Sequence, residues 1–359
     1  MLDILSMTAE EIGARLDGEP KFRVTQIMKW LHEKRCTNFN DMKNIPKILR
    51  EKLSVEFFIT SLKVRKVLVS SSNEGEVKKF LYRLADGNYI ETVLMKYEHG
   101  YSLCVSTQVG CRMGCKFCAS GTDGLTRNLE PSEILSQLYE TERNLGQETE
   151  KRISTIVLMG IGEPLDNFGN VTRFLQLLAD YADMSMRNIA LSTCGIVPRI
   201  NELAELRLGL TLCVSLHSTN NIRRGEIMPV NKAYNIEELM EAVRNYAAKT
   251  SRRVTVEFAV GADMPAETAR EEAHSLIRLL RGMNKICHVN LLPLNSIECN
   301  RIDGHGNADV SGENTALKHI LKTLRENGIN ATVRRSLGRD IDAACGQLKQ
   351  RTERKEKCG

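Results

Sequence analysis

The sequence predicts an α/β protein in which a small N-terminal α+β domain precedes an open, partial barrel. From about residue 98, apolar strand-like runs alternate six times with amphipathic helical patterns, which indicates a parallel sheet covered by helices. Six strand–helix units are too few to close an eight-stranded barrel, so we expect a partial (β/α)6 barrel. Before residue 98 the order differs, because helical patterns come first and strand patterns follow them.

The N-terminal domain is predicted to span residues 1–97. Thr8-Ala-Glu-Glu11 is a capping-box pattern at a helix start, and residues 22–35 place apolar side chains at helical spacing. Asp86-Gly87 is a hairpin signal between two strand-like runs. The expected strands of this domain are Leu62–Val69, Val77–Leu84 and Tyr89–Met95.

The barrel is predicted to span residues 98–345, followed by a basic, charged tail at 346–359. Its expected strands are Ser102–Gln108, Ile153–Met159, Asn188–Ser192, Leu210–Leu216, Val254–Val260 and His288–Leu292. The helices between and after them are expected near 131–145, 170–182, 198–206, 235–248, 266–281 and 314–327. Active residues should lie at the C-terminal ends of the strands, as in other barrels of this kind.

Composition favours a cytoplasmic enzyme. No apolar run approaches the ~20 residues of a membrane span, and the N-terminus carries acids where a signal peptide needs bases. The eleven cysteines in 359 residues are too sparse and too locally clustered for a secreted disulfide scaffold, so a reducing compartment fits better. The net charge of +5 is a mild indication of an anionic partner.

The most informative motif contains Cys111, Cys115 and Cys118 in a C-x3-C-x2-C spacing. Three thiolates can hold three corners of a [4Fe–4S] cluster, which normally takes four protein ligands. The remaining iron could bind the amino and carboxylate groups of S-adenosylmethionine (SAM). Zinc is the alternative, although it usually takes four Cys or His ligands and no second pair follows here. The run, with Phe117 before its third cysteine, resembles the signature of the radical-SAM superfamily.

A second motif follows the second barrel strand at residues 159–165. Gly160 and Gly162 allow a ligand to approach the backbone closely, and Glu163 can accept hydrogen bonds from an ammonium group. Glycine and proline turns after strands are common, so the motif is weak by itself. One β/α unit after the cysteine motif, it resembles the radical-SAM segment that contacts the methionine amino group.

The run Asp340–Leu348 around Cys345 resembles, nearly letter for letter, the C-terminal motif of the RlmN/Cfr family of RNA adenine methyltransferases. The similarity extends over essentially the whole chain, including residues 21–31, Asn88–Val93 and Asn235–Leu239. It implies a radical-SAM partial barrel with two cofactors, a [4Fe–4S] cluster and SAM. It also implies 23S rRNA (peptidyl-transferase loop) and tRNA (next to the anticodon) as substrates, a reducing electron-transfer protein as partner, and a monomer.

The resemblance also assigns roles to individual residues. Cys345 becomes the methyl-carrying nucleophile, Cys104 the thiol that later resolves it, and Glu91 the proton acceptor. An exposed strand acid is the alternative for Glu91, because solvated carboxylates are the usual case. Cys111, Cys115 and Cys118 would hold the cluster, and the SAM contacts would be Gly162, Glu163, Ser192, Ser215, Leu216, His217 and Asn295.

The target carbon explains why such machinery is needed. C2 of adenine is electron-poor, so it cannot attack the methyl group of SAM directly. In the family's mechanism a Cys345 thiolate first takes a methyl group from one SAM. A radical generated from a second SAM then abstracts hydrogen from that methyl group, and the carbon adds to the adenine ring. Loss of the ring proton and attack by Cys104 release the product and leave a disulfide.

Two alternatives stay open at this stage. A Cfr-type enzyme would methylate C8 of the same rRNA adenine. Pro164 and Val109 favour the C2 pattern, whereas residues 118–123 and 296–313 fit neither pattern cleanly. The other alternative is a zinc-stabilised RNA-binding protein without catalysis. Candidate contacts to the RNA backbone are Lys21–Lys29, Lys43–Lys52, Arg127, Arg223-Arg224, Arg334-Arg335 and Arg351–Lys357.

Overall fold

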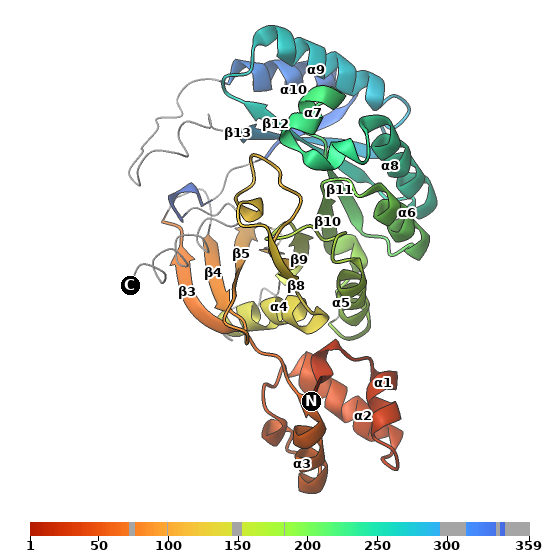
Figure 1. Cartoon of the computed structure of the whole chain (residues 1–359). Coiled ribbons are helices and arrows are strands. Elements are labelled where there is room, and N and C mark those ends of the chain that lie inside the picture. The colour runs from red at the N-terminus through yellow and green to blue at the C-terminus, as the bar shows by residue number, and fades with distance from the viewer. Residues whose placement is uncertain are drawn as a thin grey trace. The chain divides into compact units, whose positions relative to one another are not determined.

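The computed structural model describes residues 1–71, 76–98, 100–145, 153–182, 184–294, 314–334 and 338–341. The chain forms two compact units (Figure 1). Unit 1 contains residues 1–110, 125–189 and 337–359, and unit 2 contains residues 111–124 and 190–336. No helix of the described ranges is both long and apolar enough to span a membrane.

Unit 1 begins with short helices. The predicted capping box at Thr8 is confirmed, because its side chain accepts from the Glu11 N–H while Glu11 caps in return, and it starts α1 (Ala9–Arg15). The helix predicted at 22–35 is α2 (Lys21–Met28), which continues as a π-helical turn over Lys29–Glu33. α3 (Lys47–Glu56) follows, and β1 (Leu2–Asp3) pairs with β2 (Phe57–Phe58) in parallel.

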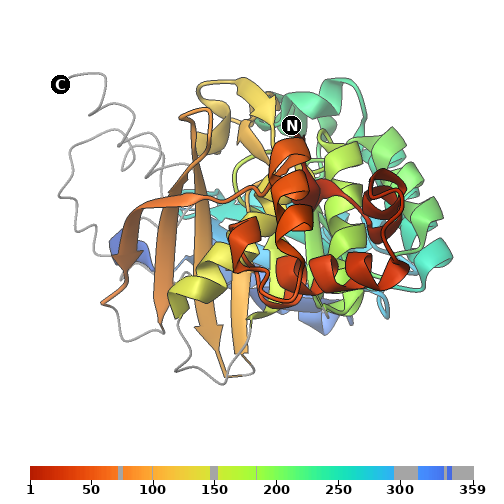
Figure 2. The ribbon, with the colours of Figure 1, turned by 90° about the horizontal axis from the view of Figure 1, so that it is seen from below.

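The sheet of unit 1 contains five strands in the order β9-β6-β5-β4-β3. β3 (Lys63–Val69), β4 (Val77–Arg83), β5 (Tyr89–Tyr97) and β6 (Gly100–Cys104) are antiparallel neighbours, whereas β6 and β9 (Ile153–Leu158) are parallel. β3 to β5 therefore extend the sheet of the first barrel strand, β6, within one unit. Figure 2 shows them side by side.

The two faces of this sheet have different coverings. On one face α4 (Pro131–Leu145) packs through side-chain hydrogen bonds from Tyr82 to Thr141 and from Thr92 to Gln137. Strand alternation places Cys104 on the opposite face, which we call the Cys104 face. Ile341, from the short turn Arg339–Ile341, packs on this second face. α5 (Phe168–Tyr181) follows β9, and β7 (Gln108–Gly110) pairs with β8 (Leu125–Asn128).

Unit 2 has the parallel strand order β14-β13-β12-β11-β10, with helices in an outer layer (Figure 1). The strands are β10 (Ile189–Thr193), β11 (Thr211–Ser215), β12 (Val254–Gly261), β13 (Cys287–Leu294) and β14 (Asn330–Val333). The helices are α6 (Val197–Leu206), α7 (Asn221–Ile227), α8 (Ile236–Thr250), α9 (Ala266–Leu279) and α10 (Thr315–Glu326). The predicted α/β class with parallel strands is confirmed. The structure adds elements that were not predicted, among them α3, α7 and the short strands β1, β2, β7, β8 and β14.

Candidate active site

The three cysteines of the first motif lie on one loop of unit 2, Cys111–Gly124, which we call the cysteine loop. The loop is closed at its base by a hydrogen bond of 2.9 Å from the Cys111 N–H to the Gly124 carbonyl. Inside it, the Cys118 N–H donates to the Cys115 carbonyl at 3.1 Å. The Lys116 N–H donates to the Ile227 carbonyl at 3.0 Å, which attaches the loop to the end of α7.

The thiols of this loop suit an iron–sulfur cluster. Cys111 is buried, and Cys115 and Cys118 are half-buried. Within the described residues, no three His, Cys, Asp or Glu side chains converge as they would around a single metal ion. A [4Fe–4S] cube binds each thiolate at a different iron, so its ligands do not have to converge on one point. Three thiols on one closed loop therefore match the donor set of such a cluster.

His217 lies beside the cysteine loop within unit 2. Its ring is 4.8 Å from the Phe117 ring in an edge-to-face arrangement. Its backbone is in the left-handed region, with φ of 58°, which is strained for a residue other than glycine. Burial lowers the pKa of His217 to about 3, with a smaller contribution from Arg224. The Nδ1 atom accepts the Ala259 N–H at 3.1 Å, so the neutral ring carries its proton on Nε2.

The strand ends of unit 2 bring the predicted SAM contacts to a buried acid that the sequence analysis missed. Ser192 donates its hydroxyl to Oε2 of Glu257 at 3.2 Å, and the Leu216 N–H donates to the Glu257 carbonyl at 3.0 Å. Ser215 is the register partner of Glu257 on the neighbouring strand. The signal for this acid is present in the sequence, since Glu257 interrupts the apolar run of β12.

Arg224 is a structural residue, so its assignment as an RNA contact is wrong. The side chain is completely buried, and its guanidinium donates to the carbonyls of Cys194, Ser215 and Leu216. Burial lowers the pKa of Arg224 to about 10. The three acceptors lie at the ends of β10 and β11, so Arg224 holds these strand ends together in unit 2.

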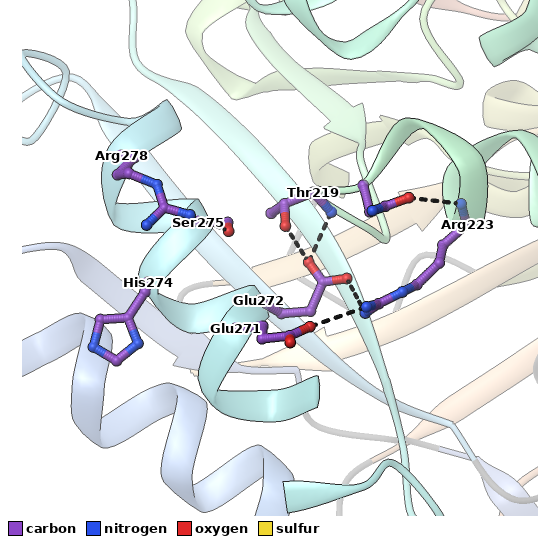
Figure 3. A pocket seen from close by; sticks show the side chains of 8 residues that line it. Thr219, Arg223, Glu271, Glu272, His274, Ser275 and Arg278 are labelled. Carbon is purple, nitrogen blue, oxygen red and sulfur yellow. Dashed lines mark hydrogen bonds and ion pairs between the residues drawn. The ribbon is translucent and has the colours of Figure 1, made fainter. Parts of the chain in front are cut away.

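A surface pocket of about 420 Å³ lies elsewhere on unit 2 (Figure 3). Glu272 accepts hydrogen bonds from Ser218 and Thr219 and pairs with Arg223, which also contacts Glu271. The carboxylates and Arg223 thus satisfy one another. The pocket contains none of the predicted catalytic, SAM-binding or cluster residues, and only Arg223 of its lining was predicted to contact RNA. Its lining consists of Thr219, Asn220, Arg223, Glu271, Glu272, His274, Ser275 and Arg278.

The glycine motif of unit 1 is shaped by a neighbouring strand end. A Cβ on Gly160 would lie 2.6 Å from the Ser106 nitrogen, and one on Gly162 would lie 2.6 Å from the Gln108 Cβ. Gly162 also has φ of +110°. The buried Glu163 receives the Leu165 N–H at 3.0 Å, and its own N–H donates to Oε1 of Gln108 at 2.8 Å. Close packing alone therefore requires these glycines, and the contact with SAM stays a prediction.

The remaining predicted residues meet on the Cys104 face. Cys104 is buried in an apolar cluster with Val77, Val93 and Ile341. Glu91 is 2 % exposed and pairs with Lys79, with 2.8 Å between Oε2 and Nζ. The alternative of Glu91 as an exposed strand acid is thus wrong. Cys345 and Asn295 lie outside the described residues.

The short segment before Cys345 is anchored to unit 1. The Asp340 carboxylate accepts the Ser70 hydroxyl at 2.6 Å and the Ser71 N–H at 2.7 Å. These hydrogen bonds hold the pKa of Asp340 below its ordinary value. Ile341, the next residue, packs in the same cluster as Cys104. The chain thus passes over the Cys104 face four residues before Cys345.

Comparison with known proteins identifies the family. Residues 3–59 match the ribosomal RNA large subunit methyltransferase N-terminal domain, and residues 105–276 match the radical SAM superfamily. A probable dual-specificity RNA methyltransferase RlmN of Clostridium novyi is 44% identical over 354 residues, covering 98% of both chains. That of Clostridium perfringens is 46% identical over 98% of this chain and 97% of its own. The chain belongs to the RlmN family.

The fold agrees with this membership. A crystal structure of a radical SAM methyltransferase from Sphaerobacter thermophilus matches with a TM-score of 0.84 and 38% identity, covering 97% of this chain and 99% of that one. The RlmN-family chain is thus a radical-SAM RNA methyltransferase, a class that implies a [4Fe–4S] cluster and SAM. The predicted family and enzyme class are confirmed, and the non-catalytic zinc alternative does not fit.

Proposed function

We propose that this RlmN-family enzyme methylates C2 of an adenine in the 23S rRNA peptidyl-transferase loop and of an adenine next to the tRNA anticodon. The name of its relatives, dual-specificity RNA methyltransferase, supports two RNA substrates. The single observation that carries the chemistry is the Cys104 face. There a buried thiol and a buried carboxylate lie beneath the segment that leads to Cys345.

Chain length supports a meeting of the two working thiols. Ile341 packs in the cluster of Cys104, and Cys345 is four residues further along the chain. Four residues span at most about 14 Å when fully extended. Cys345 therefore lies within chain reach of the Cys104 face, although its own position is outside the described residues. We infer that Cys345 is the methyl carrier and Cys104 the thiol that resolves it.

The cofactors would be held by residues from both motifs. Cys111, Cys115 and Cys118 would bind the cluster, and the SAM contacts would be Gly162, Glu163, Ser192, Ser215, Leu216, His217 and Asn295. When bound, the cluster and SAM supply a methyl group and a radical that abstracts hydrogen. The neutral His217 can donate one hydrogen bond from Nε2. Glu257 keeps the Ser192 hydroxyl oriented at its strand end.

The protein's own groups would act before and after carbon–carbon bond formation. The Cys345 thiolate is the nucleophile that takes the methyl group. After the carbon is joined to the ring, the Glu91 carboxylate would accept the ring proton, and the unpaired electron of the adduct would pass to the oxidised cluster, which leaves a closed-shell thioether between the ring and Cys345. Attack of the Cys104 thiolate on the Cys345 sulfur then forms the S–S bond and breaks the bond from Cys345 to carbon. The electron pair stays on that carbon, which takes up a proton to become the product methyl group.

RNA recognition is proposed to lie in residues 1–97. Support comes from the match of residues 3–59 to the rRNA methyltransferase N-terminal domain. Lys21 and Lys29 on the first helices, and Lys47 and Lys52 on α3, are exposed and can meet phosphates. We further propose a cytoplasmic monomer that receives electrons from a reducing electron-transfer protein.

Nucleoside mass spectrometry tests the proposed product. A deletion strain should lack 2-methyladenosine in 23S rRNA and tRNA, and expression of this chain should restore it in both. Restoration in rRNA alone would contradict the dual specificity. The appearance of 8-methyladenosine as the main product would instead assign the C8 reaction.

A further inference from the structure

Lys79 and Glu91 form an ion pair that is completely enclosed by protein. The lysine is 0 % exposed and the glutamate 2 %, with 2.8 Å between Nζ and Oε2. Burying two charges is costly, and an apolar pair of similar volume is often as stable or more stable. Stability therefore gives little reason for a lysine in the middle of β4, which suggests that the charge serves the chemistry.

Strand register places this pair beside Cys104. Lys79 lies opposite Val93 on β5, and Val93 lies opposite Cys104 on β6. Glu91 is two residues before Val93 on the same strand, so its side chain is on the same face. An ammonium, a carboxylate and a thiol thus share the Cys104 face, where Ile341 packs.

The backbone of Glu91 is also connected to the glycine motif. Its carbonyl accepts the Ser106 hydroxyl at 2.6 Å, and the same hydroxyl oxygen accepts the Ile161 N–H at 3.0 Å. Ile161 lies between the two glycines of that motif. The position of Glu91 is thus fixed by Ser106 at its backbone carbonyl and by Lys79 at its side-chain carboxylate.

We propose that Lys79 is a positioning residue that keeps Glu91 ionised and fixed in place, so that the carboxylate is ready to accept the ring proton. This inference rests on the proposed function. When Glu91 takes the proton it becomes neutral, and the Lys79 ammonium stays charged in a dry environment. The adjacent ammonium favours the charged form of Glu91 and so promotes return of the proton. The carbon released from Cys345 is the group that needs a proton at that point.

Other titratable groups lie on this face among the described residues, and they come from five elements. Strand alternation and register place on this side Lys63 and Lys66 of β3, Arg83 of β4, Tyr89 and Tyr97 of β5 and Cys104 of β6, and Asp340 joins them from the C-terminal segment. Asp340 is engaged by Ser70 and Ser71, and Lys66 is exposed. Lys79 is the cation in direct contact with the Glu91 carboxylate.

The test is a pH series on anaerobically reconstituted enzyme with substrate RNA, following turnover and the covalent protein–RNA adduct on a denaturing gel. Glu91→Gln should accumulate adduct at every pH, because the proton acceptor is absent. Lys79→Met removes the positive charge that stabilises the charged carboxylate, so its turnover should become dependent on pH in a way that the wild-type turnover is not. At low pH the turnover of Lys79→Met should fall about tenfold for each step of one pH unit, with adduct accumulating there and clearing as the pH rises.

Three controls separate charge from structure. Lys66→Met removes an exposed lysine from the same face and should leave the pH profile unchanged. Lys79→Arg keeps the positive charge and should stay close to the wild-type profile. Iron content and circular dichroism establish that each variant is folded and loaded. Should Lys79→Met fail to fold, Lys79→Gln takes its place in the same pH series.

The outcomes separate the role of Lys79 from that of Glu91 and from the proposed function. A Lys79→Met profile parallel to wild type, or lowered equally at all pH values without adduct, would overturn the role of Lys79. Normal turnover of Glu91→Gln would remove the proposed proton acceptor itself. Absence of both adduct and methylated product with the wild-type enzyme would refute the proposed function.

Discussion

Replacing Cys104 by alanine should separate the late step of catalysis from all earlier ones. The thiol lies on the Cys104 face in a cluster with Val77, Val93 and Ile341. If it acts only after the carbon–carbon bond exists, the Cys104→Ala enzyme should still methylate Cys345 and still join it to RNA. The product would then stay attached, because no thiol is present to attack the Cys345 sulfur.

The expected magnitudes make this variant informative. The substitution removes one buried sulfur atom, comparable with one methylene group, which costs roughly 1–2 kcal/mol including the small cavity. Typical stabilities of about 5–15 kcal/mol leave such a variant folded. Loss of a covalent nucleophile instead lowers turnover by at least about a thousandfold. A folded protein with trapped RNA and almost no turnover is therefore the expected result.

The assay uses labelled substrate RNA, SAM and reductant, followed by a denaturing gel and mass spectrometry of the Cys345 peptide. Cys213→Ala is a matched control, because burial raises the pKa of this core thiol to about 12 and leaves it protonated. The control should turn over normally without trapped RNA. If Cys104→Ala behaves like Cys213→Ala, Cys104 is only a core residue and the resolving role is wrong.

Two further predictions concern the cofactor site. Replacing any one of Cys111, Cys115 or Cys118 by alanine should abolish iron and sulfide binding and all SAM cleavage, because each thiolate would bind one iron of the cluster. Full activity of any one of these variants would contradict the assignment of the three cysteines as cluster ligands. Burial lowers the pKa of His217 to about 3 in the folded protein, whereas an exposed histidine in the unfolded chain has a pKa of about 6.5. Between these two values the unfolded chain binds more protons than the folded one, so the free energy of unfolding should fall as the pH drops from about 6.5 toward 3. His217→Gln should reduce that slope in thermal melts, leaving the part due to His32, whose pKa is lowered to about 4; an unchanged slope would count against a neutral buried His217.

Several features could be predicted because they depend on residues close together in the chain. The α1 capping box needs only Thr8 and Glu11, and both were found in their predicted roles. The strand–helix alternation after residue 98 depends on local periodicity, so most barrel elements were predicted within a few residues of their observed bounds. β14 was missed because its four residues lack a clear apolar run, and pairing with β13 defines it.

The residues that the sequence analysis misjudged or missed depend on distant parts of the chain. The sequence around Arg224 is typical of a surface arginine, yet its guanidinium donates hydrogen bonds to backbone carbonyls at the ends of two strands. Gly160 reads as a residue that makes room for a ligand, yet the backbone near Ser106 already fills that space. Glu257 was passed over because its partners Ser192 and Arg334 come from different strands or strand ends.

The sequence by itself determined the fold class, the RlmN/Cfr family resemblance and the spacing of the three cluster cysteines. Each of these depends only on residues that are close together in the chain. Only the tertiary structure decided whether Glu91 is a solvated acid or a buried one, because that depends on strand register. The antiparallel pairing of β4, β5 and β6 brings Lys79, Glu91 and Cys104 to one face. A shift of one residue in that register would move a strand's entire set of side chains to the opposite face.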